Sequence, residues 1–139
     1  MHAGDGEVWD KKPTIDQIFG ADSVQAILGG LNDLALRSKS NAEWAEKTRG
    51  TILQKSPMSL SVAFRQIREG AELSMADCMK MEFRILNRML DAGDFLEGIR
   101  AAIIDKDGAP NWQPKTLDDV DPNRVDAHFA PLDNGELQL

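Results

Sequence analysis

The chain has 139 residues, of which 42% are hydrophobic, and its formal net charge is −7. This length suits one domain with a buried core. The acidic balance argues against nucleic acid or an anionic membrane as the main partner, because both require a concentrated basic face. A small basic spot that holds a phosphate remains compatible with it.

Cysteine content and hydropathy bear on the compartment. The single cysteine, Cys78, cannot form an intrachain disulfide, which suits a reducing environment. The sequence contains no run of 18 apolar residues, and its start has no apolar stretch of the signal-peptide type. We therefore expect a cytoplasmic protein, or an organellar one whose targeting segment has been removed.

The apolar spacing predicts an all-α fold. Residues 1–12 are polar and Gly-rich, which is typical of a flexible N-terminal arm, whereas residues 13–139 repeat apolar residues at intervals of three and four. Residues 13–139 are therefore expected to form a single helical domain of six or seven helices. Their start signals are Asp22, Ser40 with Glu43, Ser56 with Pro57, Ser74 with Asp77, Asp94 with Glu97, Thr116 with Asp119, and Asp121 with Pro122.

Several packing expectations follow from the same pattern. The helix that begins at Ser74 carries apolar residues on more than one stripe, so it is expected to be the most buried, and the helix after Ser40 is expected near the surface. Gly70 is expected to stop the helix that begins at Ser56. Gly29 and Gly30 either allow a neighbour to approach or end their helix early. The stripe expected to face the core after Ser56 is Leu60, Ala63, Phe64 and Ile67, and the last helix is expected to pack through Val125 and Phe129.

Four segments resemble one family of enzymes. They are SPMSLSVAFRQIREG at 56–70, MEFRILNRMLDAGDFLEGIRAAIIDKDGAPNWQP at 81–114, VDAHFAPL near the end and IDQIFGADSVQAIL near the start. Together they resemble the carboxy-terminal region of 3-hydroxyisobutyryl-CoA hydrolases of the crotonase superfamily, over roughly residues 13–139. Enoyl-CoA hydratases and isomerases share the Asp-Phe-x-Glu-Gly piece, so a fragment of one of these is the alternative.

The resemblance implies both a reaction and an incomplete site. The family hydrolyses the thioester of 3-hydroxyisobutyryl-CoA in valine breakdown, and a eukaryotic member would lie in the mitochondrial matrix. Its carboxylates and backbone oxyanion hole lie in a ββα core, upstream of the matched region. Because these groups must polarise the thioester carbonyl, no catalytic residue is predicted in this sequence and the chain alone is expected to be inactive.

Two residues are candidates for contact with the CoA moiety, the only cofactor that the resemblance implies. In related crotonases the carboxy-terminal helix brings basic and aromatic side chains near the CoA nucleotide. Lys106 is therefore a candidate for a phosphate contact, and Trp112 for stacking on adenine. The alternatives are a solvated lysine whose flanking Asp105 and Asp107 weaken phosphate attraction, and a tryptophan that pins a loop onto the core.

The remaining chemical residues favour structural roles. Asp94 and Glu97 suit the N-cap and third positions of a helix, and Arg100 can pair with Glu97. Cys78 lies among methionines and is interpreted as a buried packing residue. No metal site is predicted from His2 and His128, and no serine-hydrolase elbow occurs at residues 56–61. Arg65, Glu82 and Arg84 are expected to form an ion-pair network between two helices.

Two function classes remain open at this point. The first is a fragment of a CoA-thioester hydrolase that covers the core and contacts acyl-CoA. The second is a non-enzymatic helical module that self-associates or binds another chain through an apolar face, with a symmetric dimer as the expected form.

Overall fold

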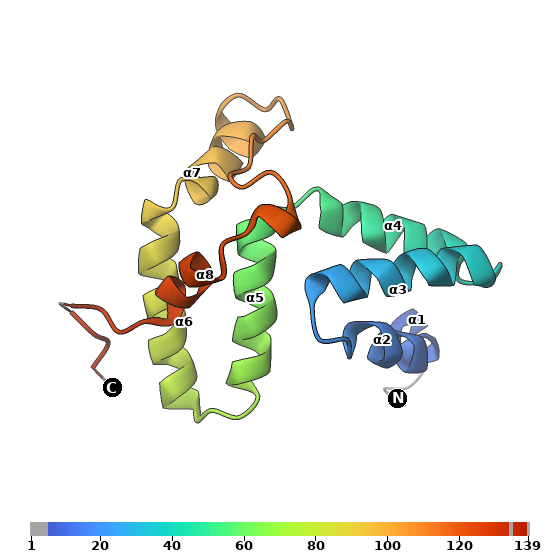
Figure 1. The fold of residues 1–139 in the computed structure, drawn as a ribbon, viewed down its shortest axis with the longest axis horizontal. Helices are drawn as coiled ribbons and strands as arrows, with labels where there is room; N and C mark the ends of the chain where they lie inside the picture. The colour runs from blue at the N-terminus through green and yellow to red at the C-terminus, as the bar shows by residue number, and fades with distance from the viewer. Residues whose placement is uncertain (1–5, 134, 139) are drawn as a thin grey trace. The chain divides into compact units, whose positions relative to one another are not determined.

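The computed structural model describes residues 6–133 and 135–138, and in these ranges the chain is helical without a β-strand. This confirms the all-α fold. The chain divides into two compact units, Met1–Gln54 and Lys55–Leu139 (Figure 1). The sequence pattern predicted one helical domain over 13–139 and gave no sign of a division after Gln54. No helix among the described residues is long and apolar enough to cross a membrane.

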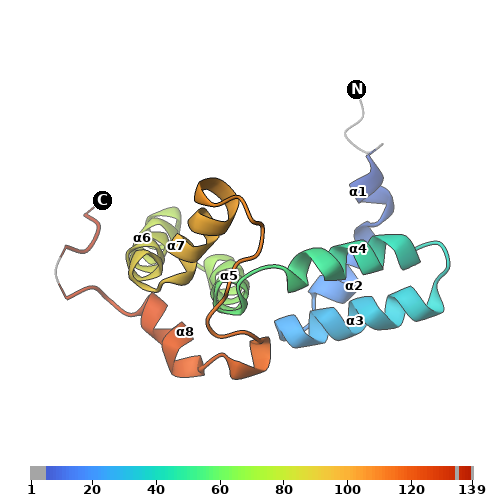
Figure 2. The ribbon, with the colours of Figure 1, turned by 90° about the horizontal axis from the view of Figure 1, so that it is seen from above.

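The first unit consists of four helices, of which α3 and α4 pack side by side as an antiparallel pair (Figure 2). The short helix α1 falls in the segment expected to be a flexible arm, whereas residues 1–5 of that segment lie outside the described residues. The four are α1 (Glu7–Asp10), α2 (Lys12–Phe19), α3 (Val24–Arg37) and α4 (Ala42–Leu53).

The core of the first unit depends on a close contact at a glycine. Leu31 on α3 and Ala45 on α4 are fully buried. A Cβ on Gly30 would lie 3.0 Å from Cδ1 of Ile18, so the missing side chain lets α2 approach α3. Gly29 and Gly30 thus lie inside a continuous helix. This confirms the first of the two alternatives, the close approach of a neighbour, at Gly30.

Both predicted start signals of the first unit are wrong in detail. The side chain that caps α3 belongs to Ser23, whose Oγ accepts from the backbone N–H of Ala26 at 3.1 Å, and not to Asp22. Helix α4 begins after Asn41 without a side-chain cap, and the hydroxyl of Ser40 lies 3.2 Å from that of Ser38.

The second unit is built on an antiparallel pair, α5 and α6, with α8 packed against both (Figures 1 and 2). Its core cluster contains Met58, Val62, Met81 and Ile85. Val125 and Phe129 of the last helix pack against this cluster, which confirms that expectation. The elements are α5 (Pro57–Gly70), α6 (Met75–Asp91), α7 (Asp94–Ile99), the π-helix η1 (Arg100–Ile104), the 3-10 helix η2 (Leu117–Asp119) and α8 (Pro122–Phe129).

Three predicted start signals are confirmed in the second unit, whereas Thr116 precedes η2 without a side-chain cap bond. The hydroxyl of Ser56 accepts from the N–H of Ser59 at 3.1 Å, that of Ser74 accepts from Asp77 at 3.2 Å, and Asp121 accepts from Asn123 at 2.9 Å. Helix α5 does stop at Gly70, as expected, but Gly70 is the last residue of the helix rather than a left-handed residue after it, and the C-cap residue Ala71 is right-handed.

The predicted buried faces of α5 and α6 are wrong. On α5 the buried residues are Pro57, Met58 and Val62, and Ile67 of the predicted stripe is 73% exposed. On α6, expected to be the most buried helix, only Met81 and Ile85 are buried. The second unit therefore shows a surplus of exposed apolar side chains.

Candidate functional site

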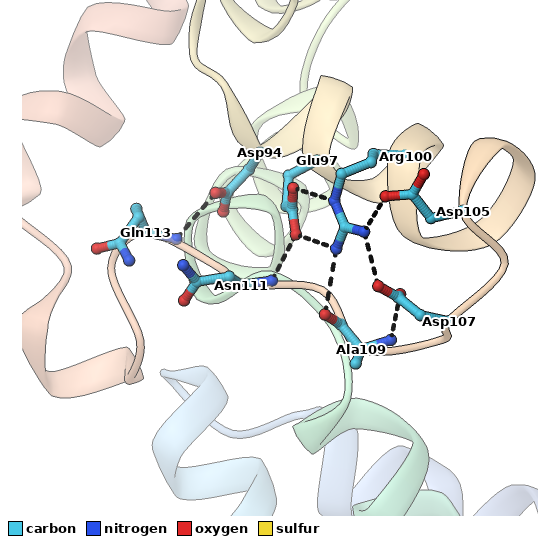
Figure 3. A network of polar contacts seen from close by, with 8 residues as sticks. All are labelled: Asp94, Glu97, Arg100, Asp105, Asp107, Ala109, Asn111 and Gln113. Atoms are coloured by element: carbon cyan, nitrogen blue, oxygen red, sulfur yellow. Dashed lines mark hydrogen bonds and ion pairs between the residues drawn. The ribbon is translucent and has the colours of Figure 1, made fainter.

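A network of polar contacts joins α7 and η1 to the loop that follows them, with Arg100 at its centre (Figure 3). The Nε and Nη2 atoms of Arg100 donate to the Glu97 carboxylate at 2.9 and 2.8 Å. Its Nη1 donates to Oδ2 of Asp105 and to Oδ2 of Asp107, at 2.7 Å each. The predicted Glu97–Arg100 pair is therefore confirmed, but it is part of a larger network.

The same helical segment holds the backbone of the loop at every second residue (Figure 3). Alternate residues of an extended segment turn their backbone polar groups to the same side. Side chains of α7 and η1 therefore take the place of a neighbouring strand and fix the loop in one register. The three bonds are Arg100 Nη2 to the Ala109 carbonyl at 3.3 Å, Asn111 N–H to Glu97 at 2.7 Å, and Gln113 N–H to Asp94 at 2.9 Å.

Asp94 does not cap its helix, as the sequence predicted, but joins three segments of the unit. Gly93 is the N-cap residue of α7, with a left-handed φ of 83°. Asp94 is only 6% exposed and accepts from the Ser56 hydroxyl at 2.5 Å as well as from Gln113. Both carboxylate oxygens are thus engaged by groups distant in sequence, so the side chain is not available for the N–H groups of α7.

The ion pairs of the network shift the ionisation of its members. The pKa of Glu97 is lowered to about 2, mainly by the hydrogen bond from Arg100 and then by the Asn111 N–H. The Ala109 N–H and then Arg100 lower the pKa of Asp107. The Glu97 carboxylate is in turn the main cause of the raised pKa of Arg100. All three groups therefore stay charged over the physiological range.

Acid is expected to release the loop only well below the ordinary range of glutamate. A carboxylate with a lowered folded-state pKa stabilises the fold fully above its ordinary value of 4.5, and the contribution is lost as the pH falls through about 2. The Asn111 amide resonance should therefore titrate with a midpoint near pH 2 rather than near 4.5. In Glu97→Gln that titration should disappear, and a wild-type midpoint near 4.5 would show that the pair is absent in solution.

Lys106 lies exposed at the turn between η1 and the pinned part of the loop. Its φ is +55°, and it is the only described residue other than glycine with a positive φ. Non-glycine residues in this left-handed region are uncommon and often occur at functional sites.

Trp112 packs against α7 at a glycine. A Cβ on Gly98 would lie 3.2 Å from Cη2 of Trp112, so Gly98 provides the space for the indole. Sequence reasoning did not single out Gly98, although a glycine inside a helix is itself a signal of close approach. The ring is half-buried, as expected of a residue that pins a loop.

Two open grooves lie in the second unit, and they share Phe95. The first, here called the Trp112 groove, has a volume of about 340 Å³. The second, called the α6 groove, has a volume of about 540 Å³. Residues that line the Trp112 groove include Lys55, Ser56, Asp94, Ile99, Ile103 and Trp112, and those of the α6 groove include Met79, Phe83, Leu86, Met89 and Leu137.

The ion-pair network expected of Arg65, Glu82 and Arg84 does not form. Arg65 binds Glu69 at 2.5 Å and Asp126, and its guanidinium lies 4.2 Å from the centroid of the Phe129 ring. It thereby holds α8 against α5.

Arg84 instead makes a bidentate pair with Glu136, with Nε at 2.9 Å from Oε1 and Nη2 at 2.9 Å from Oε2. Each arginine therefore anchors a segment from the end of the chain. Sequence spacing could not predict these partners, because they lie 52 and 61 residues away from the arginines.

The remaining candidates show no arrangement typical of catalysis. Cys78 is half-buried, and its Sγ donates to the Gly70 carbonyl at 3.5 Å. His128 is buried, with Nδ1 at 2.7 Å from the Arg124 carbonyl. His2 lies outside the described residues. Within residues 6–133 and 135–138, no three His, Cys, Asp or Glu side chains gather to hold a metal ion.

Comparison with known proteins identifies relatives over nearly the whole chain. The family model described as Enoyl-CoA hydratase/isomerase matches residues 2–129. The mitochondrial 3-hydroxyisobutyryl-CoA hydrolase of Dictyostelium discoideum is 42% identical over 128 residues, which are 91% of this chain and 32% of that protein. Small ribosomal subunit protein mS47 of Arabidopsis thaliana is 36% identical and is matched over 100% of this chain and 35% of its own length.

A solved structure has the same helical arrangement. The carnitinyl-CoA dehydratase of Mycobacterium thermoresistibile superposes with a TM-score of 0.84 at 30% sequence identity. The match covers 99% of this chain and 38% of the dehydratase. The chain thus spans about a third of the length of the curated relatives that it matches.

Proposed function

Since the chain belongs to the enoyl-CoA hydratase/isomerase family, we propose that it is the helical carboxy-terminal part of a CoA-thioester hydrolase acting on 3-hydroxyisobutyryl-CoA in valine degradation. In this function its second unit covers the catalytic part of the enzyme, and the loop of Lys106 and Trp112 contacts CoA. The mitochondrial relative supports the mitochondrial matrix as the compartment in a eukaryotic source.

The apolar surface of the second unit carries this proposal. Ile67, Leu96, Ile103 and Ile104 are each more than half exposed, and Ile103 also lines the Trp112 groove. Large exposed apolar patches are rare on soluble monomers and mark interaction sites. In the dehydratase of similar structure, the matched region is 38% of a longer chain. We infer that the partner of this surface is the remaining part of a crotonase-type enzyme.

The reaction itself needs groups outside the described network. Thioester hydrolysis requires donors aimed at the developing oxyanion and a carboxylate that activates water. Glu97, Asp105 and Asp107 are committed to Arg100, and Asp94 to Ser56 and Gln113. We therefore propose that the catalytic groups come from the covered part and that this chain alone does not hydrolyse the thioester.

Calorimetric titration of CoA into the purified chain tests the proposed contact. We expect binding that Lys106→Ala weakens by about tenfold, because one phosphate ion pair contributes roughly 1.4 kcal/mol in that case. Lys115→Ala, which removes another exposed lysine a few residues along, is the matched control and should bind as the wild type does. Equal affinities in both variants would exclude the Lys106 contact.

A non-enzymatic assembly role is the second candidate. A ribosomal protein, mS47, is matched over the full length of this chain, so members of the family occur outside metabolism. The exposed apolar surface would then bind another chain or a second copy. Size-exclusion chromatography with light scattering at micromolar concentration should show a dimer of the 15.4 kDa chain, which Ile103→Glu dissociates. A clean monomer would exclude self-association.

A further inference from the structure

The carboxylates of Asp105 and Asp107 bind Arg100 in the structure, although their sequence positions place them on either side of Lys106. In the sequence Asp105-Lys106-Asp107, two carboxylates flank one ammonium group, and they would weaken its attraction for a phosphate. In the structure, both carboxylates turn to the same atom, Nη1 of Arg100, at 2.7 Å each (Figure 3). The ion pairs of this turn join Asp105 and Asp107 to Arg100, and the Lys106 side chain takes part in none of them.

The backbone explains how one arginine reaches both aspartates. In an α-helix, side chains three or four residues apart are neighbours, and a residue five positions on points elsewhere. The π-helix η1 bonds residues five apart, with the Asp105 N–H donating to the Arg100 carbonyl at 2.8 Å, so Asp105 lies beside Arg100. Such single π-turns occur frequently at functional sites.

The second aspartate is placed by the turn after Lys106. The left-handed backbone of Lys106, with φ 55°, reverses the chain after the π-helix. The Gly108 N–H then donates to the Ala101 carbonyl at 3.1 Å, which closes the turn. Asp107 uses Oδ1 for the Ala109 N–H at 2.9 Å and Oδ2 for Arg100. The turn therefore directs both carboxylates toward Arg100 and presents the Lys106 side chain to solvent.

From this geometry we propose that Arg100 is a positioning residue for phosphate binding: it draws the carboxylates of Asp105 and Asp107 to itself and offsets part of their charge, so that Lys106 is available to the phosphate groups of a CoA nucleotide. The inference rests on the proposed contact between Lys106 and CoA. It assigns to Arg100 an electrostatic task in addition to its bonds with the loop. Without Arg100, two uncompensated carboxylates would stand beside the incoming phosphate and repel it.

The test separates the electrostatic task from a role in folding. CoA affinity is measured by calorimetry for Arg100→Met, for Arg100→Met combined with Asp105→Asn and Asp107→Asn, and for the two aspartate substitutions alone. Arg100→Met should bind CoA about tenfold more weakly, the size expected when about 1.4 kcal/mol of repulsion is added. The triple variant should recover to within about threefold of the wild type, because the two carboxylates that flank Lys106 are then uncharged amides.

A fold control accompanies each variant. Hydrogen exchange of the Asn111 and Gln113 amides reports whether the loop is still held by Glu97 and Asp94. Should Arg100→Met loosen the loop, the aspartate double variant remains informative, since it keeps Arg100 and should bind CoA at least as tightly as the wild type. Weaker binding in that variant, with normal exchange, would overturn the proposal.

The outcomes also separate this inference from the proposed function. Wild-type binding that Lys106→Ala weakens, but that Arg100→Met leaves unchanged, would overturn the inference alone. A triple variant that stays as weak as Arg100→Met would also overturn it, because the arginine would then act only through the fold. Absence of CoA binding to the wild type, or binding insensitive to Lys106→Ala, would overturn both.

Discussion

Asp94→Ala is expected to lower the free energy of unfolding of the second unit by about 3 kcal/mol. The substitution removes the acceptor of the Ser56 hydroxyl and of the Gln113 N–H, which bind it at 2.5 and 2.9 Å. Asp94 is 6% exposed and Ser56 is 4% exposed, so water does not readily replace the lost bonds. Urea denaturation followed by circular dichroism measures the change.

The matched control for this prediction is Asp91→Ala. Asp91 is exposed at the end of α6, so the same substitution there should change stability by less than about 0.5 kcal/mol. The stability of Asp94→Asn should lie between those of Asp94→Ala and Asp91→Ala. The amide oxygen of the asparagine can still accept from one of the two donors, whereas its NH2 group faces the other. Equal stability of Asp94→Ala and Asp91→Ala would show that the three-segment junction is not formed in solution.

Sequence reasoning succeeded where a signal is local. The sequence predicts helix starts at Ser56, Ser74 and Asp121, and each hydroxyl or carboxylate accepts a backbone N–H two or three residues ahead. Such bonds depend only on neighbouring residues, which the sequence displays. At Asp22 and Ser40, by contrast, the residue at the N-cap is the next one along the chain, Ser23 or Asn41, and the pattern could not decide between adjacent polar residues.

Burial was predicted less well, because apolar spacing shows which residues share a helix face but not what covers it. Ile67 belongs to a regular stripe on α5 yet is 73% exposed, whereas Met58 and Val62, outside that stripe, are buried. The stripe was assigned to a core within this chain. Under the proposed function the exposed part of this stripe, Ile67, faces the remaining part of the enzyme, which would explain why the apolar pattern extends to an exposed position.

In the polar network around Arg100, the sequence predicts one ion pair but not the larger set of contacts. The spacing of Glu97 and Arg100 gave their ion pair directly. The π-turn, which brings Asp105 to Arg100, has no signature in the sequence pattern. The contact of Asp94 with Ser56 spans 38 residues and therefore depends on how the chain brings the starts of α5 and α7 together, which only the structure reveals.

Leu31→Ala is expected to destabilise the first unit by about 3 kcal/mol, within the range of 2–5 kcal/mol typical of buried leucines. Leu31 is 0% exposed in the middle of α3, and removing its side chain leaves a cavity beside α2 and α4. The first unit is small, so it has little other core to compensate. Hydrogen exchange of the α3 and α4 amides measures the loss, with exchange faster by about two powers of ten.

Leu36 provides the control, since it lies on the same helix and is 80% exposed. Leu36→Ala makes the same chemical change and the same small gain in helix propensity without opening a cavity. Its α3 and α4 amides should exchange at wild-type rates or slightly more slowly. If Leu36→Ala destabilised the unit as much as Leu31→Ala, the face of α3 that carries Leu36 would be buried in solution, and the first unit would also possess a docking surface.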